Sequence, residues 1–166
     1  MKFELLNINT FEMQERAIED IVECNEQTAS YGLSLNKNQA LHLVKTREFA
    51  LKENGRVEFE SVVINKLINE FCSSAYISNS NYEQVMHQLI ETFYFFKNET
   101  LDFVSDDELI EFMYKAYEGS CQGSIELLAG RELEEFAQRL RANAYHCELE
   151  PEDVPLENDM EETDEY

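Results

Sequence analysis

The residues best suited to covalent chemistry lie in the stretch Gly119-Ser120-Cys121-Gln122-Gly123. A G-x-C-x-G pattern can form a nucleophile elbow, and Cys-Gln-Gly occurs at some cysteine-protease sites. Both sites need a strand that delivers the cysteine and a histidine base. Here an apolar helical pattern precedes the cysteine, and none of His42, His87 and His146 stands in a local signature. We therefore interpret the stretch as a turn between helices, with Cys121 as the one candidate catalytic residue.

A reactive cysteine needs a thiolate, which nearby cations or a helix N-terminus stabilise. The nearest bases in the sequence are Lys115 and Arg131, whereas Glu118 and Glu126 stand closer to Cys121. The start of the next helix would favour the thiolate, but this effect is usually less than one pKa unit. The sequence thus predicts an ordinary, slowly reacting thiol at Cys121.

Metal-binding patterns are equally sparse. Glu83 and His87 are four residues apart on one helical pattern, but a di-iron bundle uses Glu-x-x-His pairs, and no such pair occurs. His146 and Cys147 are adjacent potential ligands for a soft metal, and two ligands do not define a site. We expect no metal and no cofactor.

Two other clusters of chemically similar residues suggest structural roles. Asp106, Asp107 and Glu108 stand where a helix begins, and acids there complement the helix dipole. The four aromatics at positions 93–96 cover all sides of a helix, so this helix is either surrounded by others or offers one side to a partner. We expect it to be fully buried.

The charge of the chain excludes several classes of ligand. In 166 residues, 13 Lys and Arg face 35 Asp and Glu, which gives a net charge of -22. This field repels phosphate, so direct binding to nucleic acid or to an anionic membrane is disfavoured. A protein partner with a basic surface is compatible with this charge, although the charge also serves solubility.

The four cysteines form no C-x-x-C pair, and the N-terminus lacks the apolar run of a signal peptide. No apolar stretch is long enough to span a membrane. Cys24 and Cys72 fall within apolar helical patterns and are typical of small core residues. We expect reduced thiols and a cytoplasmic location.

Apolar periodicity and capping residues predict an all-α fold, a single and mostly antiparallel bundle of about six helices. Capping boxes are predicted at Asn36, Ser80 and Ser105, and Thr10 is a candidate N-cap. Strand signals are confined to short stretches near residues 5–8 and 103–104, and no internal repeat of fixed period is visible. The expected helices cover residues 11–30, 37–54, 59–74, 80–97, 105–118 and 124–145, with a break or kink at Gly130.

The chain divides into a helical domain, residues 1–146, and an acidic tail, residues 147–166. The tail contains ten acids, both prolines and no Lys or Arg, so we expect it to be disordered.

Five stretches together resemble a 6323-like family of domains of unknown function, from anaerobic, spore-forming Gram-positive bacteria. The resemblance implies a helical domain and assigns no catalytic or binding residue. It covers roughly residues 30–140 and is carried by residues 31–35, 55–59, 93–100, 106–110 and 121–124.

Without a catalytic constellation, phosphate loop or basic groove, the sequence favours a non-enzymatic protein-interaction or regulatory module. One alternative is a small thiol-dependent enzyme or sensor that uses Cys121. Another is an acidic mimic of nucleic acid that inhibits a basic partner.

Overall fold

The computed structural model describes the backbone of residues 2–148 and the side chains of residues 10–145. No strand occurs in that part of the chain, and six long helices account for most of it, which confirms the predicted all-α bundle. The elements are α1 (Lys2–Glu23), α2 (Asn25–Thr28), the 3-10 turn η1 (Ala29–Tyr31), α3 (Lys37–Glu53), α4 (Val62–Phe71), α5 (Tyr82–Glu99), α6 (Asp106–Glu118), α7 (Ile125–Leu127), the π-helical turn η2 (Leu128–Glu132) and α8 (Leu133–Glu148).

Two of the three predicted capping boxes are present. The side chains of Asn36 and Ser105 each accept a hydrogen bond from the backbone of the third helical residue, and that residue's side chain bonds back to the cap. The box predicted at Ser80 is wrong. Helix α5 begins at Tyr82, because the Asn81 carboxamide accepts a 2.8 Å hydrogen bond from the Ser78 amide and forms a turn there.

The N-terminal helix differs from the prediction at both ends. Helix α1 begins at Lys2, so Thr10 lies inside it and is not an N-cap, and residues 5–8 are helical instead of extended. It ends at Glu23, before the predicted position. The cause is Asn25, whose carboxamide makes two 2.8 Å hydrogen bonds with the backbone of Leu35 and draws the following chain back onto the bundle.

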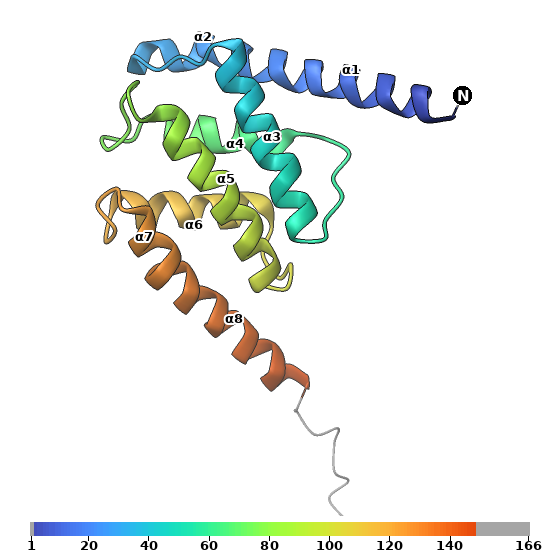
Figure 1. The fold of residues 1–166 in the computed structure, drawn as a ribbon. Helices are drawn as coiled ribbons and strands as arrows, with labels where there is room; N and C mark the ends of the chain where they lie inside the picture. The colour runs from blue at the N-terminus through green and yellow to red at the C-terminus, as the bar shows by residue number, and fades with distance from the viewer. Residues whose placement is uncertain (1, 149–166) are drawn as a thin grey trace, which may run out of the picture.

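The helices form two crossing layers (Figure 1). Helices α1, α4 and α6 run in one direction, and α3, α5 and α8 run in another. Consecutive helices alternate between the layers, so the chain makes three helical hairpins: α1 with α3, α4 with α5, and α6 with α8.

Neighbours within a layer run parallel, which corrects the expectation of mostly antiparallel packing. His42 of α3 pairs with Glu83 of α5, and farther along the same two helices Asn54 pairs with Asn98. Such a sequence of contacts arises only when two helices point the same way. The hairpins therefore stack like the units of a helical repeat protein.

The spacing of the stacked hairpins is regular although their sequences are not. The pair His42–Glu83 joins α3 to α5 in one layer, and the pair Ser73–Tyr114 joins the turn after α4 to α6 in the other layer. Each pair spans 41 residues. The sequence shows no repeat of this period, because each hairpin satisfies the same packing with different side chains.

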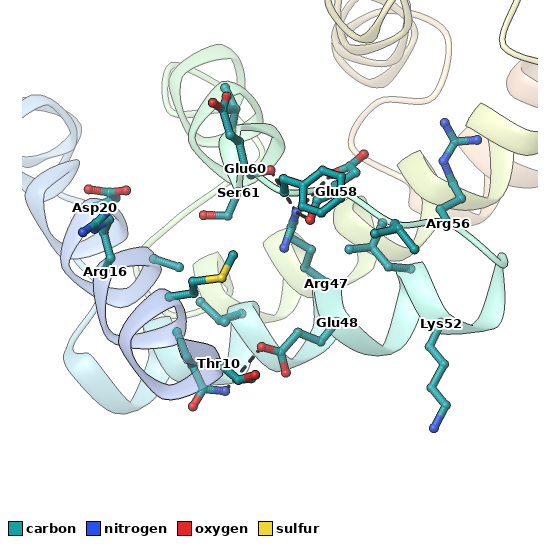
Figure 2. Close-up of a pocket in the computed structure, with 18 of the residues that line it drawn as sticks. Thr10, Arg16, Asp20, Arg47, Glu48, Lys52, Arg56, Glu58, Glu60 and Ser61 are labelled. Atoms are coloured by element: carbon teal, nitrogen blue, oxygen red, sulfur yellow. Dashed lines mark hydrogen bonds and ion pairs between the residues drawn. The ribbon is translucent and has the colours of Figure 1, made fainter. Parts of the chain in front are cut away.

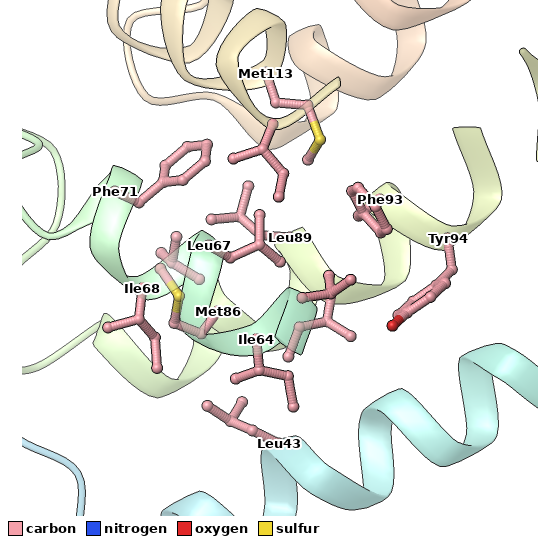
Figure 3. Packing of buried hydrophobic residues seen from close by; sticks show 14 of the residues in the cluster. Leu43, Ile64, Leu67, Ile68, Phe71, Met86, Leu89, Phe93, Tyr94 and Met113 are labelled. Atoms are coloured by element: carbon pink, nitrogen blue, oxygen red, sulfur yellow. The ribbon is translucent and has the colours of Figure 1, made fainter. Parts of the chain in front are cut away.

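Helix α5 occupies the centre and contacts α3, α4, α6 and α8. Its buried face packs with that of α4 in the core that Figure 3 shows. Of the aromatic quartet, Phe93, Tyr94 and Phe96 are buried, but Phe95 is 49% exposed, so the expectation of full burial is wrong at this position. Cys24 and Cys72 are only half-buried at the edge of the core.

Helix α8 runs to Glu148, so the backbone of Cys147 and Glu148, which we assigned to the tail, is helical. The rest of the predicted tail, residues 149–166, lies outside the described residues.

Candidate functional site

The glycines around Cys121 have a backbone role. Gly119 ends α6 and donates to the carbonyl of Lys115 over 3.0 Å. Gly123 has a φ of 79°, and a Cβ there would lie 2.5 Å from the ring of Tyr76. Glycine is therefore required at position 123 both for conformation and for space. This accounts for the G-x-C-x-G pattern as the turn that the sequence predicted.

The Cys121 thiol is enclosed by this turn and only 2% of the residue is exposed. Burial raises its pKa above the ordinary value of 9.0. Arg131, remote in the sequence, lies close in space and donates to the Ser120 carbonyl over 3.2 Å. Its charge lowers the thiol pKa, but burial is the larger effect.

The histidines whose side chains are described lie on α3 and α5, and the contacts of their rings are with residues other than Cys121. The rings of His42 and His87 stack at 4.9 Å. Glu83 bonds to His42 over 2.8 Å, and His87 bonds to Glu91 over 2.6 Å. Glu83 and His87, which the sequence placed on one helix face, therefore pair with other residues. Among the described residues no group of three potential metal ligands occurs, and the side chains of His146 and Cys147 lie outside them.

The acidic triplet at the start of α6 has a structural partner for each member. Asp106 pairs with Lys97 and Asp107 with Lys66, both over 2.9 Å, and Glu108 completes the capping box of Ser105.

The segment between α3 and α4, residues 54–61, which we call the strap, is fastened by a buried arginine. Arg47 of α3 donates to the Glu60 carbonyl over 2.9 Å and to the Glu58 carboxylate over 3.2 Å. Figure 2 shows its guanidinium pointing into the strap from α3. Glu58 therefore turns inward, while its neighbours Val57 and Phe59 are 80% and 82% exposed.

The strap, α1, α3 and the start of α4 enclose a groove of about 940 Å³, which we call the strap groove (Figure 2). Its margin carries four exposed apolar side chains: Met13, Val57, Phe59 and Val62. Its charged lining residues are four bases and four acids: Arg16, Arg47, Lys52, Arg56, Asp20, Glu48, Glu58 and Glu60.

A second hollow, of about 790 Å³, lies on the outer side of the α3–α5 pair and reaches η2. We call it the aromatic groove, because Phe49 of α3 and Phe95 of α5 line it and are 61% and 49% exposed. Its charged lining residues are all acids: Glu53, Glu91 and Glu134.

The π-helical turn η2 forms one wall of the aromatic groove. Gly130, where the sequence predicted a break, lies in this turn and lines the groove. A Cβ added at Gly130 would have nothing within 4 Å, so the wall is open at this point. π-Helical turns are often found at functional sites.

In the sequence, no catalytic motif marks the residues that line the two grooves. Two sequence features could have indicated these grooves. One is the alternation of Val57 and Phe59 with charged residues, and the other is the run of four aromatics at 93–96, of which Phe95 does not fit into the core.

These features define an all-helical domain with two surface grooves. The chain belongs to the family of unknown function DUF6323, whose model matches residues 20–146. No curated protein and no solved structure matches the chain significantly. The helices of the described part include none that is long and apolar enough to cross a membrane.

Proposed function

We propose that this chain is a non-enzymatic protein-interaction module that binds a basic, apolar segment of a partner protein in the aromatic groove. The observation that carries the proposal is the pair Phe49 and Phe95, exposed on parallel helices and facing one groove. Exposed aromatics that line a hollow are typical anchors of protein interfaces.

The charge of the groove supports a basic partner. The charged residues that line it, Glu53, Glu91 and Glu134, are all acids, and the whole chain carries -22. Glu91 bonds to His87 and Glu134 lies 3.9 Å from Arg141, so part of this negative charge is offset from outside the lining. Carboxylates at the rim of an apolar groove attract a positively charged segment and speed its association.

The free thiols of the described cysteines support a cytoplasmic location.

The test is affinity purification from the native host with three forms of the chain. The wild type and the variant Phe103→Ser are compared with the double variant Phe49→Ser/Phe95→Ser. Phe103 is a matched control, since it is 59% exposed and lines neither groove. We expect a basic protein that the wild type and the control retain and the double variant loses.

Two results would contradict the proposal. Identical sets of proteins on all three forms would show that the aromatic groove binds nothing. A basic partner that is lost in high salt but is indifferent to Phe49 and Phe95 would instead favour the acidic nucleic-acid mimic, in which charge alone does the binding.

A further inference from the structure

The strap groove differs from the aromatic groove in charge and in lining, and it suggests a different ligand. The four bases and four acids of its lining have no net formal charge. The whole chain, by contrast, has 35 acids and only 13 Lys and Arg. Arg47 is paired with Glu58, and Arg56 is paired with Asp102 over 2.9 Å. These guanidinium groups are therefore already neutralised, and the groove is a poor site for an anion.

The exposed apolar side chains point to an apolar occupant. Val57, Phe59 and Met13 lie on the margin with more than half of each residue exposed, at 80%, 82% and 55%. Exposed apolar residues gathered around one hollow are characteristic of a binding site, whereas isolated ones are common on any surface.

Two buried polar atoms narrow the class of occupant. The Nε of Arg47 and the Oδ1 of Asn65 belong to groove-lining residues and have no hydrogen-bond partner among the described residues. One is a donor and the other an acceptor. A peptide main chain offers both an acceptor and a donor, whereas a lipid chain offers neither.

We propose that the strap groove is a second binding site, which receives an apolar, uncharged peptide segment of a partner protein. Phe59 and Val57 contact its side chains, and Arg47 and Asn65 bond to its main chain. Both polar atoms are shielded from water, so the segment reaches them by shifting the strap. No residue of the strap is fully buried, so this shift removes little apolar surface from the core. It is opposed by the hydrogen bonds that Arg47 and Tyr94 make to Glu58, and the binding of the segment must outweigh them.

The probe is a displayed library of random linear peptides, selected on the full chain. Enriched peptides are synthesised, and their affinities are measured by calorimetry for the wild type and for variants. We expect apolar peptides with few charges, whose affinity falls at least about tenfold with Phe59→Ser and with Asn65→Leu. Phe103→Ser and Gly130→Arg, which alter surfaces outside this groove, should leave their affinity unchanged.

The outcomes separate this inference from the proposed function. If every enriched peptide is basic and responds to Gly130→Arg and not to Phe59→Ser, the aromatic groove is supported and the strap groove is overturned. Enrichment of acidic peptides, or of none, would overturn it as well. Apolar peptides that respond to Phe59→Ser but not to Asn65→Leu would overturn the main-chain recognition. A dimer in sedimentation equilibrium that Phe59→Ser dissociates would make the occupant a second copy of the chain and overturn the peptide assignment.

Discussion

The hydroxyl of Tyr94, on the central helix, donates a 2.7 Å hydrogen bond to the Glu58 carboxylate in the strap. The same carboxylate oxygen receives the Arg47 guanidinium. Burial raises the pKa of Tyr94, so the phenol stays protonated and remains a donor at any physiological pH. The strap is therefore held by a network that begins in the core, and the shape of the strap groove depends on α5 as well as on α3.

We expect Arg47→Ala to destabilise the fold by about 3 kcal/mol, because it leaves the partly buried Glu58 carboxylate without its cation. The control is Lys66→Ala, which breaks the exposed pair with Asp107 and should cost less than about 1 kcal/mol. Urea unfolding monitored by circular dichroism measures both. Equal effects would mean that the Arg47 network contributes no more than a surface pair.

We expect Leu89→Ala to cost about 2–5 kcal/mol, because Leu89 is fully buried at the centre of the core (Figure 3) and its truncation leaves a cavity. On the exposed face of the same helix, Phe95→Ala should change the free energy of unfolding by less than about 0.5 kcal/mol. Chemical denaturation of the two variants checks the orientation of α5. A loss below about 1 kcal/mol for Leu89→Ala would contradict it.

Gly123→Ala should destabilise the fold by about 2 kcal/mol or more, since the left-handed backbone is strained for alanine and the new Cβ collides with Tyr76. Gly130→Ala should be neutral or stabilising, because its Cβ enters open space. Thermal melts of this matched pair distinguish a structural glycine from one that leaves a groove open. A neutral Gly123→Ala variant would refute the backbone explanation of the motif around Cys121.

Stability should fall as pH rises above about 9. Burial raises the pKa of the Cys24, Cys72 and Cys121 thiols above their ordinary value of 9.0, and it raises the pKa of Tyr117 to about 12. In this range the unfolded chain loses protons that the folded chain retains, so the free energy of unfolding decreases with pH. Below the pKa values of these groups in the unfolded chain, both states keep their protons and this loss of stability is absent.

Denaturation midpoints at about pH 7.5 and about pH 10 measure this slope, and Cys121→Ala should reduce it. The reactivity of Cys121 toward iodoacetamide should follow the same raised pKa. An apparent pKa below about 7 would contradict the burial argument and revive the thiol-dependent alternative.

The sequence alone determined the class of fold and much of its local structure. The capping boxes at Asn36 and Ser105 and the turn at Gly119–Gly123 depend on residues within a few positions of one another, so they can be predicted from spacing. The end of the first helix and the start of α5 were predicted wrongly, because Asn25 and Asn81 form hydrogen bonds between their side chains and the backbone.

Only the tertiary structure decided where the grooves lie. The parallel stacking of α3 on α5 places Phe49 beside Phe95, and the approach of Arg131 to Cys121 depends on how η2 returns toward the end of α6. Such contacts join residues far apart in the chain, and a periodic pattern specifies which face is buried without specifying which helix covers it. For that reason the sequence predicted the core, and the packing of the hairpins decided what remained exposed for a partner.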